Sequence, residues 1–122
     1  GGGGWYTQFN GDTGTNYAYH GMRANGSAAS VLTGTSNNVM YHSTFYEAAS
    51  TYGAFVLDIL DYANTSKYKT IRALGGGDAN GNGYISFFSG LWMNTNAVTS
   101  ISLYTGNTTL QYSHFALYGI MA

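Results

Sequence analysis

Charged residues are scarce in this sequence. Only 7% of its 122 residues are Asp, Glu, Lys or Arg, and the formal net charge is −1, whereas about a quarter of an ordinary soluble domain is charged. A basic stripe that would neutralise phosphates is missing, which argues against a nucleic-acid partner. Five carboxylates and three histidines also leave few groups for general acid-base catalysis. We therefore expect a protein that is not an enzyme.

Cysteine and proline are absent altogether. Without cysteine, the chain has neither a disulfide framework nor a thiolate zinc site. No apolar run reaches the roughly eighteen residues of a membrane span, so we expect no membrane partner. With 44% hydrophobic residues, the chain is too apolar for a disordered protein, and its length suits one domain. We predict a flexible glycine leader over residues 1–4 and a single domain over residues 5–122.

Ser, Thr, Asn and Gln keep the sequence polar in place of charges. Burying a hydroxyl or an amide costs much less free energy than burying a charge. A surface of this kind suits a protein whose copies pack against one another. The composition thus favours an assembled, structural protein.

The apolar positions favour strands, because they hold mostly β-branched and aromatic residues, including twelve Tyr and six Phe. Asn-Gly pairs at residues 10–11, 25–26, 80–81 and 82–83 accept the positive φ angles of tight hairpins. The alternating segments between the turns predict strands over these ranges: 5–9, 16–24, 38–47, 53–62, 67–74, 83–93, 98–104 and 113–121. About eight strands at this spacing predict an all-β fold, a single antiparallel β-sandwich. Residues 45–54 are the best helical candidate, with a turn or two.

Residues 78–83 match the first half of a calcium loop. Asp78, Asn80 and Asn82 supply oxygens at its first, third and fifth positions, and a glycine follows. The carboxylate expected at the twelfth position is missing, because Ser89 stands there. We therefore interpret the segment as a hairpin loop and expect no cofactor, with calcium binding as the weaker alternative.

Histidines and carboxylates offer two further candidates. His20, His42 and His114 lack the spacing of a metal site, and we expect them to be hydrogen-bonded strand residues. Asp58 and Asp61 would suit glycoside hydrolysis, but three residues apart on a strand they point to opposite faces. We expect neither group to be catalytic.

The aromatic and amide residues also suit sugar binding, since rings stack on sugar faces and amides bind hydroxyls. For most rings we expect positions in the core or in a subunit interface. A few residues are predicted to form an assembly or ligand surface: Tyr17, Tyr19, Tyr41, Tyr46 and Trp92.

Two stretches resemble a known family. The first is Phe9-Asn-Gly-Asp-Thr-Gly-Thr-Asn-Tyr-Ala-Tyr-His20, followed by Arg23-Ala-Asn-Gly-Ser27; the second is Thr99-Ser-Ile-Ser-Leu103, then Gly106-Asn107, then Phe115-Ala-Leu-Tyr-Gly-Ile120. Together they are similar to small jelly-roll-like β-sandwich domains in virion proteins of tailed bacteriophages, where these occur in head-decoration or tail-fibre components. The likeness covers most of residues 5–120. It departs from the family at Gln111-Tyr112-Ser113, where relatives tend to have Gly-Ser.

The resemblance implies a non-enzymatic structural protein on the outside of a virion. It implies self-association, often as a trimer, and packing on other capsid or tail proteins. Capsid decoration and a tail-fibre domain are alternatives within this class. A carbohydrate-binding or receptor-binding module at a fibre tip, with host surface glycans as ligands, is the alternative from another class. The last segment, 113–121, is expected to be a strand without which the fold is lost.

Overall fold

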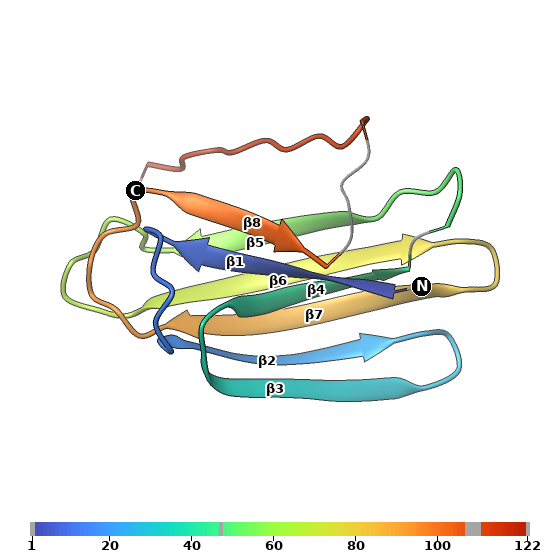
Figure 1. Ribbon diagram of the computed structural model, residues 1–122, viewed down its shortest axis with the longest axis horizontal. Helices are drawn as coiled ribbons and strands as arrows, with labels where there is room; N and C mark the ends of the chain where they lie inside the picture. The colour runs from blue at the N-terminus through green and yellow to red at the C-terminus, as the bar shows by residue number, and fades with distance from the viewer. Residues whose placement is uncertain (1, 47, 107–110, 122) are drawn as a thin grey trace.

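The computed structural model describes residues 2–46, 48–106 and 111–121. Within these ranges the chain forms eight strands and no helix. The strands make two antiparallel sheets that lie one over the other (Figure 1). The prediction of an all-β sandwich is confirmed. The prediction of a helix over residues 45–54 is wrong, because the described residues there complete one strand, make a single hydrogen-bonded turn at residues 48–51 and begin the next strand.

The two sheets differ in size. The smaller sheet has the order β4-β1-β8, and the larger has the order β3-β2-β7-β6-β5. The strands are β1 Gly2–Phe9, β2 Tyr17–Ala24, β3 Ala29–Asn37, β4 Met40–Tyr46, β5 Ala54–Leu60, β6 Lys69–Asp78, β7 Gly83–Trp92 and β8 Ile101–Thr105. In Figure 1, β1 and β4 are drawn across β6 and β7. In the strand order of the larger sheet, β7 is the middle strand, with β2 on one side and β6 on the other.

Two of the predicted Asn-Gly turns form hairpins. Asn80 and Gly81 both have positive φ, at 53° and 104°, and the N–H of Ala79 donates to the carbonyl of Asn82 at 2.7 Å. This turn joins β6 to β7. Residues 25–28 join β2 to β3 in the same way, so these two turns place four of the five strands of the larger sheet next to a sequence neighbour.

The glycine leader is part of the sandwich. Residues 2–4 open strand β1 and pair with the end of β4, so the prediction of a flexible leader is wrong for these residues, and Gly1 lies outside the described ones. A side chain at Gly4 would collide with the ring of the buried Tyr41. Glycine at this position lets the strand approach that ring, which a composition-based prediction does not detect.

Two strand predictions are also wrong. Strand β3 was not predicted, because it is rich in Ser, Thr and Gly and carries few large apolar residues. Residues 113–121, by contrast, were predicted to be a strand, but they belong to no strand pairing among the described residues. Their apolar side chains are 56% to 94% exposed, so the segment is not a closing strand of the core.

The core lies between the two sheets and is largely aromatic. One cluster holds Phe9, Tyr17, Met40, Ile71 and Trp92, all fully buried. Burial of each such large side chain contributes about 1.5–3 kcal/mol relative to exposure. A second cluster of Tyr41, Ala73 and Phe88 adjoins it. The core accounts for the buried faces of β6 and β7, whose alternation was predicted correctly.

Asp12 links the loop between β1 and β2 to the core through hydrogen bonds. Its carboxylate accepts hydrogen bonds from Trp92 Nε1 at 2.7 Å and from Asn16 Nδ2 at 3.0 Å. The hydroxyl of Tyr17 donates to the Asp12 carbonyl at 3.0 Å. Desolvation raises the pKa of Asp12, but the hydrogen bonds from Trp92, Asn16 and Gly14 outweigh it and lower that pKa below its usual value.

Candidate assembly surfaces

The aromatic residues predicted to form an outer surface lie mostly inside the protein. Tyr17, Tyr41 and Trp92 are buried in the core, so the prediction is wrong for these three. Tyr19 and Tyr46 are half-buried, and the Tyr19 ring packs 5.7 Å from that of Tyr41. Alternation along a strand separates two faces but does not say which one points inward, and this ambiguity caused the error.

The segment with calcium-loop spacing forms the β6–β7 turn, as the hairpin interpretation predicts. Asp78 Oδ1 accepts a hydrogen bond from the backbone N–H of Asn80 at 2.8 Å. This side-chain contact supports the turn directly. Asn82 supplies its carbonyl to the same turn. Asp78, Asn80 and Asn82 therefore all take part in the β6–β7 turn, and this role accounts for their spacing.

The three histidines are not brought together. His20 is exposed on β2, His42 is buried on β4, and His114 lies in the exposed segment after β8. Among the described side chains, no three His, Asp or Glu residues lie close enough to hold a metal ion. Desolvation by burial lowers the pKa of His42 to about 4. Backbone hydrogen bonds at His42 and Tyr6 oppose this shift in part, but neither ring nitrogen has a described partner at full hydrogen-bond geometry.

The two aspartates have separate environments. Asp58, on β5, forms an ion pair with Arg72 of β6, with 3.1 Å between Oδ2 and Nη2. Asp61 begins the following turn with a φ of 53°, and its carbonyl accepts the N–H of Asn64. The carboxylate of Asp58 is thus held by Arg72 on the exposed side of the sheet, whereas Asp61 lies in the turn that follows β5.

The outer face of the larger sheet carries an unbroken apolar row. The backbone register places one apolar residue on each of the five strands directly beside the next. The row runs Val31, Met22, Phe87, Leu74 and Val56, from β3 to β5. These side chains are 48% to 85% exposed. Scattered exposed apolar residues are ordinary, but a contiguous row makes this face a candidate interaction surface.

Two other rows flank this apolar row. On one side, small residues surround a single large one: Ala29, Ala24, Ile85, Gly76 and Ala54. On the other side the row is polar: Thr33, His20, Ser89, Arg72 and Asp58. We call these three rows together the outer face. Sequence alternation had separated its residues from the inner ones on β5, β6 and β7, but only the cross-strand register shows that they form continuous rows.

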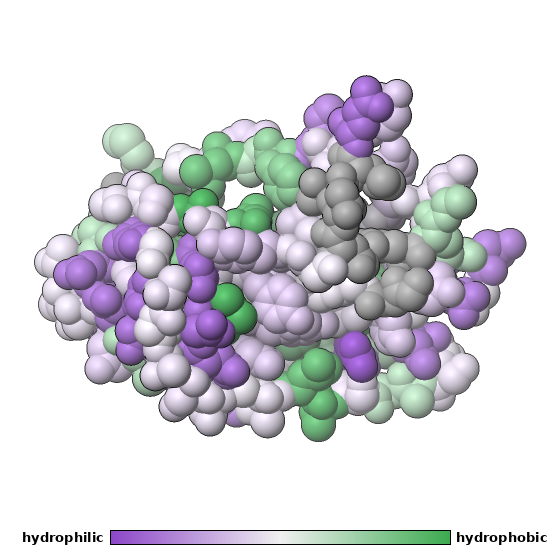
Figure 2. Space-filling model, in the orientation of Figure 1, coloured by the Kyte–Doolittle hydropathy of each residue, from purple (hydrophilic) through white to green (hydrophobic). Residues whose placement is uncertain are grey.

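The segment after β8 is a second exposed apolar surface. Leu117, Tyr118, Ile120 and Met121 are each more than 80% exposed, and Phe115 is its one anchored ring, 5.6 Å from the ring of Trp5. In Figure 1 the segment runs along the upper edge of the molecule. Figure 2 shows hydrophobic side chains along that edge, while the rest of the visible side is mostly neutral or hydrophilic.

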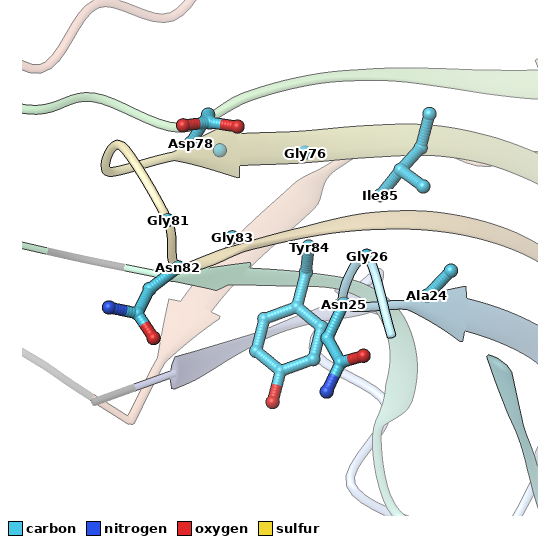
Figure 3. Close-up of a pocket in the computed structure, with 11 residues that line it drawn as sticks. Ala24, Asn25, Gly26, Gly76, Asp78, Gly81, Asn82, Gly83, Tyr84 and Ile85 are labelled. Atoms are coloured by element: carbon cyan, nitrogen blue, oxygen red, sulfur yellow. The ribbon is translucent and has the colours of Figure 1, made fainter. Parts of the chain in front are cut away.

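An open hollow of about 560 Å³ lies between the β2–β3 and β6–β7 turns (Figure 3). Its polar residues include Asn25 and Asp78, and Tyr84 is the one described aromatic residue along it. Much of this chemistry is already used. Asn25 Oδ1 accepts two backbone N–H groups of its own turn, and the guanidinium of Arg23 lies 5.2 Å from the centre of the Tyr84 ring. The hollow is therefore weaker as a binding site than the outer face is as a contact surface.

Comparison with protein families, with curated proteins and with solved structures finds no match to this chain. The described residues also contain no helix of the length and hydrophobicity that crossing a membrane requires.

Proposed function

We propose that this protein is a non-enzymatic structural domain that assembles with copies of itself on the outside of a tailed-bacteriophage particle, as a decoration or fibre component. The apolar row across the outer face carries the proposal. The phage assignment comes from the resemblance of the two sequence stretches. The scarcity of charge agrees with a surface that other subunits cover, because few ions have to be desolvated on contact.

The size of the exposed apolar surface supports self-association. A large side chain presents roughly 150–250 Å² of surface when free, so the row and Ile85 together expose on the order of 600 Å². That is the upper end of what a monomer shows to water. At about 25 cal/mol per Å² of buried apolar surface, covering it is strongly favourable, although association itself costs several kcal/mol.

The segment over residues 113–121 adds a directional contact to the proposal. It differs from every other apolar surface of the described chain in being extended and lying outside both sheets. An extended segment that docks on a neighbour makes a head-to-tail contact, and head-to-tail contacts that close on themselves form rings such as trimers. We propose that this segment makes the contacts of the trimer that the resemblance implies.

Light scattering of the purified chain after size exclusion tests the proposal. We expect a mass that is a multiple of the 13.0 kDa chain and that persists on dilution into the micromolar range. A variant with Leu117→Ser and Ile120→Ser should have a lower mass, and Thr13→Ser, on an exposed loop, is the matched control. A monomer at every concentration would overturn the proposal.

Sugar binding is the second candidate, and the position of Tyr84 in the hollow favours it. Asn25 and Tyr84 point to the same side in Figure 3, as they would to hold a hexose between an amide and a ring. A glycan array with the wild type and Tyr84→Ala tests this candidate. Saturable binding that Tyr84→Ala abolishes and Tyr68→Ala retains would favour the receptor-binding module, and no binding to any glycan would exclude it.

A further inference from the structure

We infer that the outer face pairs with the outer face of a second copy, about a two-fold axis that runs close to β7. This inference rests on the proposed self-association and names the surface and the symmetry that produce it. It is drawn from the order of side chains across the sheet, which reads nearly the same from either edge.

The apolar row is close to a palindrome about its middle residue. Phe87 stands on the central strand, Met22 and Leu74 flank it, and Val31 and Val56 end the row. The two ends are the same residue type, and the flanking pair is similar in volume and hydrophobicity. A two-fold axis along β7 therefore sets Phe87 against its own copy, Met22 against Leu74 of the second copy, and valine against valine.

The row of small residues follows the same symmetry. Ile85 stands on β7, and the other four positions hold only Ala or Gly. Face to face, Ile85 meets its own copy, and each small residue meets another small residue. Because side chains of similar size face each other along both rows, the two sheets can approach to about 10 Å, the spacing at which stacked sheets pack.

The same two-fold axis places each residue of the polar row opposite another polar or charged residue of the second copy. Ser89 faces Ser89, His20 faces Arg72, and Thr33 faces Asp58 of the second copy. Arg72 and Asp58 are the only charges in the three rows, and they already form an ion pair within one chain. The formal charges of Arg72 and Asp58 cancel, so no net formal charge opposes the pairing of the face with itself.

The other two-fold axis that lies in the interface is less favourable. An axis along the apolar row would set the polar row over the row of small residues. Arg72 would then face Gly76 and Asp58 would face Ala54, so both charged groups would lose water without a polar partner across the contact. The strand directions agree with the axis along β7. Both neighbours of β7 run antiparallel to it, so strands at matching distances from β7 face each other with a common direction, as aligned sheet packing requires.

The extent of the face fits a stable contact. Three rows about 6.6 Å apart, across five strands about 4.8 Å apart, cover a planar area of roughly 475 Å². Side-chain relief raises the accessible area above this planar value, toward the roughly 800 Å² per partner of a standard interface. A face of this size is large enough for one copy and leaves little room for a larger partner.

Single-cysteine cross-linking tests the pairing, since the chain has no cysteine of its own. Ser89→Cys places an exposed thiol beside the axis. Across a gap of about 10 Å, two such thiols are too far apart for a direct disulfide but within reach of a short bismaleimide. Thr33→Cys is the matched control, on the same row but two strands from β7. It lies four strand spacings from its own copy, roughly 19 Å in the plane of the sheet.

We expect Ser89→Cys to give a covalent dimer at micromolar protein, with at least a fivefold lower yield from Thr33→Cys alone. A mixture of Thr33→Cys and Asp58→Cys chains should restore the cross-link. Equal yields from Ser89→Cys and Thr33→Cys would overturn the two-fold pairing. So would an uncross-linked Ser89→Cys chain whose light-scattering mass exceeds one chain, and that result would leave self-association standing. A monomeric mass with no cross-link would overturn both proposals.

Discussion

Acidification should destabilise this protein through one buried side chain, His42. The ring lies on β4 between the sheets, is fully buried, and packs 5.1 Å from the ring of Phe55. Desolvation lowers its pKa from the ordinary 6.5 to about 4. A difference of about 2.5 between the unfolded and folded pKa values corresponds to about 3 kcal/mol of folding free energy.

The direction follows from which state binds the proton. Above pH 6.5 the imidazole is neutral in both states, so its protonation has no effect on stability. Between pH 6.5 and about 4 the unfolded chain takes up the proton and the folded chain does not, so stability falls as the pH falls. Below about pH 4 both states are protonated and the loss levels off.

Urea unfolding followed by tryptophan fluorescence measures this loss, because Trp5 and Trp92 are both buried. From pH 7.5 to pH 4.5 we expect the free energy of unfolding to fall by about 2.5 kcal/mol. His42→Phe should remove most of that fall, since a ring of similar size cannot be protonated. Asp12 does not interfere, because its lowered pKa makes it lose its contribution only below about pH 4. An equal fall in the wild type and in His42→Phe would refute the reasoning.

Three further changes test how the sandwich is held together, each by urea unfolding. Asp12→Ala should cost about 1–3 kcal/mol, because Trp92 Nε1 loses its acceptor; no change would mean that water replaces the carboxylate. Gly90→Ala should lower the free energy of unfolding by about 1–3 kcal/mol, because the new methyl group overpacks against the buried Met40. Gly11→Ala is the control: it lies on an exposed turn with free space around it, so it tests backbone strain alone and should lower the free energy of unfolding by less. A chain ending at Tyr112 should still unfold cooperatively, because the described contact it loses is Phe115 on Trp5; a chain that does not fold would restore the closing strand expected from the sequence.

The β-sandwich could be predicted because apolar and polar residues alternate along its strands and Asn-Gly pairs mark its turns. Alternation over the predicted strand 67–74 places Lys69, Ile71 and Ala73 on one face, and all three are buried. The inward lysine could not have been anticipated from its type. Its ammonium group donates to the carbonyls of Lys67 and Thr95 at 2.8 and 3.1 Å, so loop geometry, which the local sequence does not encode, makes its burial tolerable.

The outer face was harder to predict, because its rows depend on pairing between strands that are distant in sequence. Alternation within the predicted strands separates Phe87 from Phe88 and Leu74 from Ala73, but nothing local shows that Met22 lies beside Phe87. Strand β3 completes the row and has almost no apolar signal of its own. Conversely, an alternating apolar pattern suggested a strand over residues 113–121, although a pattern alone supplies no pairing partner.

The mass of the Phe87→Lys variant, measured by sedimentation equilibrium beside that of the wild type, tests most directly whether the outer face is buried between two copies. Phe87 is half-exposed in the single chain, so lysine there should be tolerated by the fold, while two copies would bring two ammonium groups together on the axis. We predict that the variant has half the mass of the wild type, whether the wild type is a dimer or a pair of trimers. An unchanged mass above that of one chain would contradict the account.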